Sequence, residues 1–389
     1  MLKVKLMNKI AKVGTDVLSP AKYEVGADVE NEDAIMVRSA ALHDMPFGEN
    51  LRAIARCGAG VNNIPVDKCT KAGVVVFNTP GANANAVKEL AIAALILASR
   101  DLVGGIKWVE ALAGQTGVAK AVEAGKSAFV GHELAGKTLG VVGLGAIGGM
   151  VANAAISLGM NVMGYDPYIT AKAAWSLAPS VRQASDYAEI FKNCDYITLH
   201  VPATPQTKNM ISEKTIAQMK DGVRILNLAR ADLVNAEDMK AALRTKKVAV
   251  YVTDFPTDET VGEEGVIAIP HLGASTVESE DHCAVMAAQQ LDEFLTCGNI
   301  RNSVNFPTVC VPYSEKPRVC IMNENVPNML SQITSTFSAQ NINIENLANG
   351  SKGEVAYTIL ETNVVAGEAV INALESIQGV FGVREFHFA

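Results

Sequence analysis

The apolar residues of this chain gather in short, nearly continuous runs that alternate with segments of helical periodicity from Val4 to about Ser279. Continuous runs are typical of parallel strands that are buried on both faces. Their alternation with helical segments predicts an α/β fold of parallel sheets covered by helices. The predicted strands include 34–39, 51–58, 74–78, 138–145, 161–166, 196–201, 224–229 and 248–254.

The pattern changes beyond a segment at 302–317 that carries three prolines. The order of elements there is β-α-β-β-α-β, which predicts a small ferredoxin-like unit. This unit has no cluster of acids, bases or metal ligands, so the sequence favours a binding or regulatory role for it. Its predicted strands are 318–322, 342–348, 354–362 and 380–388, and its predicted helices are 329–340 and 367–376.

Gly143, Gly145 and Gly148 form a G-x-G-x-x-G motif between a β-rich run and a helix that is expected to end at Gly159. In dinucleotide-binding units the first glycine permits a tight turn and the second lets the backbone approach the pyrophosphate. The third allows close packing of helix and strand. The strand–glycine–helix context makes this motif far more specific than the glycines alone.

The strand after this helix ends in Asp166. Its carboxylate would accept hydrogen bonds from the adenosine ribose and repel a 2′-phosphate, while the pyrophosphate would lie at the helix start near Ala146 and Ile147. The sequence therefore predicts NAD rather than NADP as the cofactor.

The dinucleotide motif lies in the middle of the chain, so the βα units before it need a sheet of their own. A helix at about 279–297 would complete that sheet, which predicts two Rossmann-like lobes with a cleft between them. The predicted domains are a discontinuous substrate-binding domain at 1–86 and 279–304, an NAD-binding Rossmann domain at 87–278, a linker at 305–317 and the C-terminal unit at 318–389.

Composition narrows the functional classes. The formal net charge of −8 and the pI near 5.4 argue against a nucleic-acid or membrane partner. The first residues build no signal-peptide core, and the longest apolar run, at 90–98, is too short to span a bilayer. The seven cysteines are scattered without metal-ligand spacing, which favours reduced thiols, a cytoplasmic location and no metal.

Candidate catalytic residues follow predicted strands of the second lobe, where an open α/β sheet binds its ligands. They are Arg230, the acidic segment 253–259 and His271. Arginine binds a carboxylate at two points, and histidine is the usual acid/base near neutral pH. The pattern predicts hydride transfer between NAD and a small 2-hydroxy acid.

The segments GLGAIG, YDPY, HVPATPQTKNMI, NLARADLVN and PHLGAST together resemble the D-2-hydroxyacid dehydrogenase family. With the C-terminal unit, the chain is most similar to the members that oxidise D-3-phosphoglycerate to 3-phosphohydroxypyruvate, the first step of L-serine biosynthesis. The resemblance implies that Arg230 binds the substrate and that His271 is the acid/base. The candidate cofactor-binding residues are Gly143, Gly145, Ala146, Ile147, Gly148, Asp166, His200, Val201, Pro202, Thr207, Leu228, Ala229, Arg230, Thr253, Asp254, His271, Gly273 and Ala274.

The family pairs its histidine with a Glu in a D-V-F-P-x-E segment, whereas this chain reads T-D-F-P-T-D-E. Aligning Phe-Pro puts Thr253 at the nicotinamide-facing Asp of the family and Asp258 at its Glu. Asp258 is therefore the first candidate for the partner of His271, and Glu259 is the second. Asp254 is a candidate nicotinamide contact.

The resemblance also implies substrate-binding loops in the first lobe. Arg38 and Ser39 match a pair that holds the substrate anion, and 56–63 match a glycine loop whose backbone N–H groups would face a carboxylate. The candidate substrate-binding residues are Arg38, Ser39, Cys57, Gly58, Ala59, Gly60, Asn83 and Lys88.

The C-terminal unit resembles an ACT domain, a module that senses small molecules. Asn323, Asn325 and Asn343 match its effector loops, which implies L-serine as an effector bound across a dimer interface. Asn328 stands where the family usually has Gly. The chain is expected to be a homodimer or homotetramer.

Other functions stay open at this point. One is another D-2-hydroxyacid dehydrogenase, such as a glyoxylate/hydroxypyruvate reductase or a D-lactate dehydrogenase, although these normally lack an ACT unit. The others are a non-catalytic, NAD-sensing protein that binds partners and a purely regulatory amino-acid sensor. The intact pair of Arg230 and His271 argues against both non-enzymes.

Overall fold

The computed structural model describes residues 1–312 and 314–387. It divides the chain into two compact units, Met1–Asn83 with Val277–Ala389, and Ala84–Thr276. Each unit has a parallel sheet, and the first also has a small antiparallel sheet, which confirms the predicted α/β class. Among the helices of the described residues, none combines the length and apolarity that crossing a bilayer requires.

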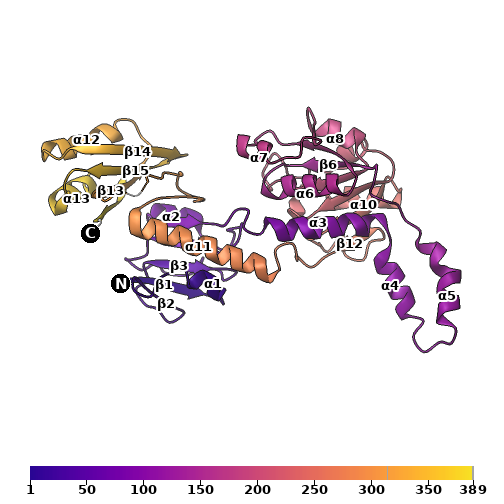
Figure 1. Cartoon of the computed structure of the whole chain (residues 1–389). Coiled ribbons are helices and arrows are strands. Elements are labelled where there is room, and N and C mark those ends of the chain that lie inside the picture. Colours follow the sequence, from indigo (N-terminus) through magenta and orange to yellow (C-terminus); the bar gives the residue numbers. More distant parts are fainter. Residues whose placement is uncertain (313, 388–389) are drawn as a thin grey trace. The chain divides into compact units, whose positions relative to one another are not determined.

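Five parallel strands in the order β2-β1-β3-β4-β5 form the first sheet (Figure 1). All four residues of β3 are fully buried, and α11 packs against β3 and β4. Gly14 lets α1 approach α11, because a Cβ atom there would lie 2.4 Å from that of Ala284. The elements are β1 (Leu2–Met7), α1 (Lys12–Thr15), β2 (Tyr23–Gly26), β3 (Ala34–Val37), β4 (Ala53–Arg56), α2 (Val66–Lys71), β5 (Val75–Phe77) and α11 (Val277–Cys297).

The antiparallel sheet of this unit has the order β14-β15-β13-β16, with α12 and α13 packed on one face. Its order along the chain is the predicted β-α-β-β-α-β. Asn328 precedes α12 with φ of 68°, a left-handed conformation that asparagine tolerates better than most residues. The elements are β13 (Arg318–Glu324), α12 (Met329–Ala339), β14 (Ile344–Lys352), β15 (Val355–Thr362), α13 (Gly367–Glu375) and β16 (Val380–Phe386).

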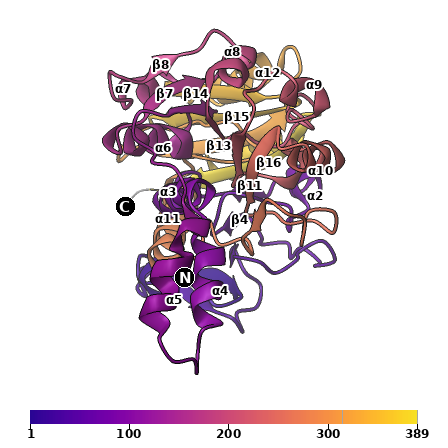
Figure 2. The same cartoon turned by 90° about the vertical axis from the view of Figure 1, so that its right-hand side faces the viewer.

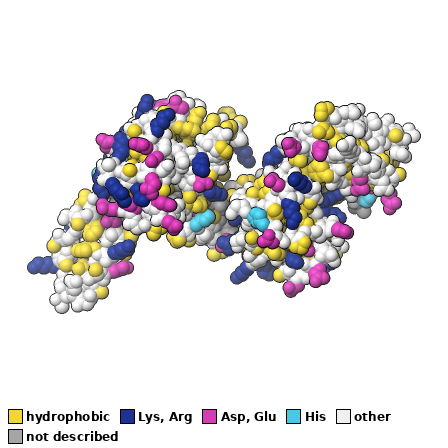
Figure 3. Space-filling view, turned by 180° about the vertical axis from the view of Figure 1, so that it is seen from behind, with side chains coloured by type: hydrophobic (Ala, Val, Ile, Leu, Met, Phe, Trp, Pro, Cys, Tyr) yellow, Lys and Arg dark blue, Asp and Glu magenta, His cyan; other side chains and the backbone are white. Residues whose placement is uncertain are grey.

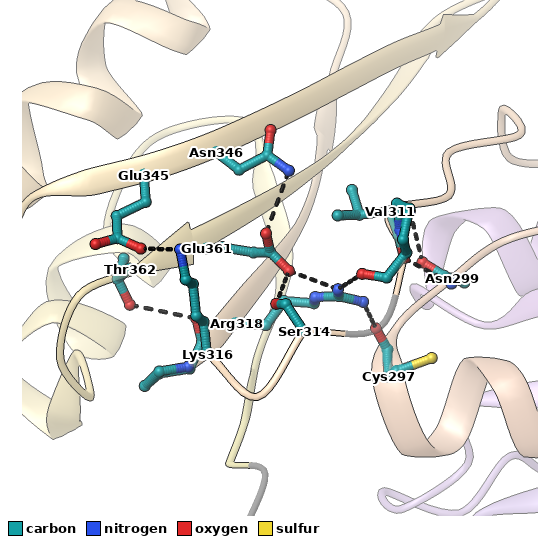
Figure 4. Close-up of polar contacts among 12 residues, drawn as sticks. Cys297, Asn299, Val311, Ser314, Lys316, Arg318, Glu345, Asn346, Glu361 and Thr362 are labelled. Carbon is teal, nitrogen blue, oxygen red and sulfur yellow. Dashed lines mark hydrogen bonds and ion pairs between the residues drawn. The ribbon is translucent and has the colours of Figure 1, made fainter.

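A buried ion pair joins this sheet to the end of α11 (Figure 4). The guanidinium of Arg318 donates to a carboxylate oxygen of Glu361 at 2.7 Å and to the carbonyl oxygen of Cys297 at 2.8 Å. Ser314 and Asn346 donate to the same carboxylate. The arginine side chain is fully buried, so these contacts replace its hydration and fix the sheet to the helix.

Seven parallel strands in the order β12-β11-β10-β9-β6-β7-β8 form the sheet of the second unit. The order reverses between β6 and β9, which is the switch point where such sheets bind ligands. The elements are α3 (Ala84–Ser99), α4 (Leu102–Glu110), α5 (Val118–Gly125), η1 (Lys126–Phe129), β6 (Thr138–Val142), α6 (Ala146–Ser157), β7 (Asn161–Tyr165), α7 (Ala171–Trp175), β8 (Arg182–Gln183), α8 (Tyr187–Asn193), β9 (Tyr196–Leu199), α9 (Glu213–Ile216), β10 (Val223–Asn227), η2 (Ala231–Leu233), α10 (Ala236–Arg244), β11 (Val248–Thr253) and β12 (Val266–Ala268).

Helices α4 and α5 form an arm (residues 101–131) that projects from the second unit and that the hydrophobic pattern did not predict (Figure 2). Neither helix has a buried residue. Trp108 packs on Phe129, with ring centroids 5.4 Å apart, and holds the arm together. Apolar side chains remain exposed on it (Figure 3), among them Ile106 at 60% and Val109 at 46%.

Candidate active site

The glycine motif lies at the carboxyl end of β6, beside the end of β9. Gly143 has φ of 90°, and a Cβ atom there would lie 2.6 Å from the carbonyl oxygen of His200, so only glycine fits. A Cβ atom at Gly148 would lie 1.9 Å from the carbonyl oxygen of Gly143. At Gly145 nothing in the described chain, apart from its own neighbours, lies within 4 Å of that position. The backbone at Gly145 is therefore open to a ligand.

Asp166, which follows β7, closes the glycine loop. One carboxylate oxygen accepts a hydrogen bond from the N–H of Leu144 and the other from that of Tyr168, each at 2.9 Å. Each oxygen keeps a further lone pair, which a ribose hydroxyl can use. The start of α6 at Ala146 and Ile147 is the positive end of a 12-residue helix. These groups fit a dinucleotide.

The loop after β9 is held at the same end of the sheet. Nε2 of His200 lies 2.9 Å from Oγ1 of Thr198, and burial lowers the pKa of His200 to about 4. This imidazole is therefore neutral at pH 7. Oγ1 of Thr207 donates to the carbonyl oxygen of Pro202 at 2.7 Å, which fixes the turn that follows Val201.

Arg230 is positioned by the buried side chain of Asn227 at the end of β10. The amide nitrogen of Asn227 donates to the carbonyl oxygen of Arg230 at 2.8 Å, and its oxygen accepts from the N–H groups of Ala229 and Arg230. The turn through Leu228 and Ala229 is therefore tightly defined. The guanidinium of Arg230 lies over the ring of Phe255, 5.7 Å from its centroid.

Strand β11 pairs with β10, so the residues that follow it lie beside Arg230. Thr253 is fully buried, and its hydroxyl accepts from the N–H of Phe255 at 3.0 Å. Asp254 is 1% exposed, and its carboxylate accepts from the N–H groups of Leu272 and Gly273, each at 2.7 Å. Both side chains thus support the site from inside.

His271 is exposed at the start of the segment that Asp254 anchors. Its φ of 53° lies in the left-handed region, a conformation that recurs at functional sites. The imidazole packs on Phe255 with ring centroids 4.5 Å apart. Arg230 and His271, which lie far apart in the sequence, therefore converge on one aromatic ring.

The acidic segment does not reach the histidine in this conformation. In the part of the chain that the structure describes, neither a hydrogen bond nor an ion pair joins Asp258 or Glu259 to His271. A hydrogen bond from Thr257 lowers the pKa of Glu259, so that carboxylate is already engaged. Asp254 is the acid that the structure connects to the histidine segment, through its backbone.

The substrate residues predicted in the first unit include Arg38 and Ser39, which follow β3, and residues 57–60, which follow β4. Oδ1 of Asn8 accepts from the N–H groups of Ser39 and Ala40, at 3.1 and 2.9 Å. Nε of Arg56 donates to the carbonyl oxygen of Arg38 at 3.2 Å. Asn8 follows β1 at the switch point of this sheet, and it was not predicted because a single Asn after a strand carries no motif.

The glycine loop after β4 packs under an arginine. A Cβ atom at Gly58 would lie 1.4 Å from Nη1 of Arg56, so the guanidinium covers Gly58. Burial raises the pKa of the Cys57 thiol to about 12, which keeps it neutral.

Two further candidates follow β5 in the sequence. Oδ1 of Asn83 is buried, and the described residues provide it with no hydrogen-bond partner. An unpaired buried acceptor is costly, which makes Asn83 a candidate to receive a donor from a ligand. Lys88 belongs to α3 of the second unit, where its ammonium lies 3.6 Å from Glu89.

The candidate effector asparagines do not come together in one chain. Asn325 donates to the carbonyl oxygen of Gly353, at the turn between β14 and β15. Asn343 pairs with Asn363 at the opposite end of the same two strands. Asn323 is buried and donates to the carbonyl oxygen of Glu324. In residues 1–312 and 314–387, no group of three His, Cys, Asp or Glu is arranged to hold a metal.

Comparison with known proteins connects this geometry to one family. Residues 92–273 match the family described as D-isomer specific 2-hydroxyacid dehydrogenase, NAD binding domain. The chain is 34% identical over 337 residues to D-3-phosphoglycerate dehydrogenase of Synechocystis, an alignment that covers 82% of this chain and 58% of that protein. D-3-phosphoglycerate dehydrogenase 1 of Saccharomyces cerevisiae is 32% identical, with 82% and 70% covered.

Solved structures agree in fold. The NAD⁺-bound 3-phosphoglycerate dehydrogenase of Entamoeba histolytica matches with a TM-score of 0.62 at 28% identity, over 78% of this chain and 98% of that one. A glyoxylate reductase of Paecilomyes thermophila matches with the same TM-score of 0.62 at 25% identity, over 78% and 98%.

Proposed function

The chain belongs to the D-isomer specific 2-hydroxyacid dehydrogenase family, and we propose that it oxidises D-3-phosphoglycerate to 3-phosphohydroxypyruvate with NAD, the first step of L-serine biosynthesis. Three relatives that are 34%, 33% and 32% identical to the chain carry the name of that activity. The chain spans only 58% of the length of two of these relatives. The proposal therefore rests on the geometry of the chain's own site as well as on the similarity.

The convergence of Arg230 and His271 on Phe255 is the observation that carries the proposal. The guanidinium of Arg230 binds the substrate carboxylate at two points. The imidazole of His271 takes the hydroxyl proton during oxidation and returns it during reduction. NAD, when bound, supplies the hydride acceptor, and the residues that would hold it are the glycine loop, the start of α6 and Asp166.

The far end of the substrate, which carries the phosphate, is proposed to meet the loops of the first unit. Arg38, Ser39 and the backbone of residues 57–60 are the proposed contacts, with Asn83 and Lys88 as further ones. Support comes from the position of Arg38, Ser39 and residues 57–60 after β3 and β4, and from the cation at Arg38, which suits an anion. A substrate without a distal anion would make no use of that cation.

Asp258 is the proposed acid partner of His271, ahead of Glu259, whose carboxylate hydrogen-bonds to Thr257. If Asp258 moves to the imidazole when substrate binds, Asp258→Asn will lower kcat at least tenfold, by analogy with other acid–base pairs. Glu259→Gln, a matched loss of charge one residue away, will leave it within about twofold of wild type. Equal effects of the two variants would contradict the assignment.

The test of the main proposal is NADH formation with D-3-phosphoglycerate against D-glycerate, D-lactate and glycolate. We expect the phosphorylated acid to give the highest kcat/KM, and His271→Ala to lower kcat by about 10²–10⁴-fold while NAD still binds. Turnover of D-lactate or glycolate but not of the phosphorylated acid would replace the substrate. A chain inert with all of them would favour an NAD-sensing or amino-acid-sensing protein.

The C-terminal sheet is proposed to act as an ACT regulatory domain that binds L-serine. Its β-α-β-β-α-β order supports this, as do Asn325 and Asn343 at opposite ends of β14 and β15. Because one chain keeps these two asparagines apart, a common site requires a second copy of the sheet, turned end to end. Saturating L-serine should lower the rate and raise the thermal midpoint, and a change in neither would refute the effector.

A homodimer is proposed as the smallest assembly. The arm supports this, because its exposed apolar residues need a cover that a second copy can supply. Replacing Ile106 and Val109 with Glu should convert the protein to monomers in sedimentation velocity. An unchanged sedimentation coefficient would exclude the arm as the interface.

A further inference from the structure

Arg38, the proposed phosphate-binding residue, is already paired with an acid of its own chain. Nη2 of Arg38 lies 2.6 Å from Oε1 of Glu280. This is the distance of a strong, charge-assisted hydrogen bond. The two side chains are 42% and 41% exposed, so a dissolved anion can reach the pair and compete for the guanidinium.

Both partners are carried by rigid elements. Glu280 lies in the first turn of α11, where the helix dipole favours an acidic side chain. The helix is packed into the core of the unit through Cys283, Ala284 and Ala287. Arg38 directly follows β3, and its carbonyl oxygen accepts from Nε of Arg56. The carboxylate is therefore held beside the arginine by the fold rather than by a mobile loop.

We propose that Glu280 is an internal counter-ion that competes with the substrate phosphate for Arg38 and thereby sets the affinity for phosphorylated acids. This inference takes its substrate, D-3-phosphoglycerate, from the proposed function. The competition between Glu280 and a phosphate for Arg38 does not depend on that function. A phosphate that binds Arg38 must displace the carboxylate or share the guanidinium with it, and the like charges repel each other. A substrate with an uncharged distal end neither repels the Glu280 carboxylate nor has to displace it.

The size of the effect follows from the exposure of the pair. Exposed ion pairs are weak, so removing the competitor should strengthen phosphate binding by about two- to fivefold at low ionic strength. The gain should shrink as salt screens the charges. Glu280 is thus a specificity-determining residue that acts on the phosphate end of the substrate and not on the hydride-transfer step.

The experiment compares Glu280→Gln with Glu278→Gln in the full-length protein. Glu278 is exposed in the same helical turn and loses the same charge, but residues two apart on a helix face different sides. Inorganic phosphate is titrated by calorimetry at low and high salt, which needs no turnover. The KM for D-3-phosphoglycerate and for D-glycerate is measured in parallel.

We expect Glu280→Gln to bind phosphate two- to fivefold more tightly and to lower the KM for D-3-phosphoglycerate similarly, with the KM for D-glycerate unchanged. Glu278→Gln should match wild type, and Arg38→Gln should abolish the phosphate signal. Equal behaviour of the two glutamate variants would overturn the proposal, as would weaker binding by Glu280→Gln or phosphate binding that survives loss of Arg38. If wild type turns over no 2-hydroxy acid, the proposed function fails, while the phosphate titration still decides the role of Glu280.

Discussion

The ring of Phe255 and the imidazole of His271 pack with their centroids 4.5 Å apart at an interplanar angle of 50°. The same ring lies 5.7 Å from the guanidinium carbon of Arg230. One aromatic side chain thus sets the spacing between the proposed carboxylate-binding residue and the proposed acid/base. The dehydrogenase proposal therefore makes Phe255 a positioning residue, although it carries no reactive group.

Replacing Phe255 tests this positioning role. Phe255→Leu keeps an apolar side chain but removes the ring face on which both residues pack, so kcat/KM should fall about tenfold through misplacement of the reacting groups. Phe255→Tyr retains the ring and should keep most of the activity. Steady-state kinetics with the best 2-hydroxy acid would measure both. Equal losses in the two variants would mean that the ring does not position the site.

Asp254 offers a second test, because its buried carboxylate holds the segment that carries His271. Asp254→Ala leaves the N–H groups of Leu272 and Gly273 without their acceptor. The unpaired groups should cost about 2–4 kcal/mol of stability, and kcat should fall together with the thermal midpoint. Asp254→Asn, which keeps one acceptor oxygen, should lose less of both. A variant with a lowered midpoint but normal kcat would show that the segment orders itself without Asp254.

The parts that the sequence predicted well are those with a periodic or motif signal. Continuous apolar runs indicated the parallel strands. The glycine motif indicated a tight turn at Gly143 and close packing at Gly148, and a Cβ atom would indeed clash at both positions. The arm was missed because α4 and α5 have apolar residues but bury none against their own unit. Asn8 and Glu280 were missed because each acts through a partner far away in the sequence. Only the packed sheet, with its register and strand order, brings such partners together.

His200 makes stability depend on pH in a defined window. Burial lowers its pKa to about 4 in the folded protein, against about 6.5 for a histidine in the unfolded chain. The unfolded state therefore binds more protons between these values. The contribution is complete above about pH 6.5, is lost as the pH falls toward 4, and then levels off, for a total of about 1–3 kcal/mol.

The variant His200→Asn removes this titration and keeps a polar group near Thr198. We expect its thermal midpoint to fall less steeply than that of wild type between pH 6.5 and 4.5, although carboxylates also titrate there in both proteins. Differential scanning calorimetry across this range would measure the difference. Parallel curves for the two proteins would show that His200 does not titrate differently on unfolding.

The ion pair of Arg318 and Glu361 should contribute to stability mainly through the penalty for breaking it. Arg318→Met leaves the Glu361 carboxylate buried without its cation, which should cost about 3–5 kcal/mol. Lys316 and Glu345 provide a matched exposed pair a few residues away, and Lys316→Met should cost no more than about 1 kcal/mol. The double variant Arg318→Met with Glu361→Leu should recover much of the loss, since neither side chain then needs a charged partner.

Thermal midpoints would rank the three variants, and hydrogen exchange in β13 and β15 would show whether the C-terminal sheet is the part that opens. If Arg318→Met were no less stable than Lys316→Met, the buried pair would not be what fixes this sheet to α11.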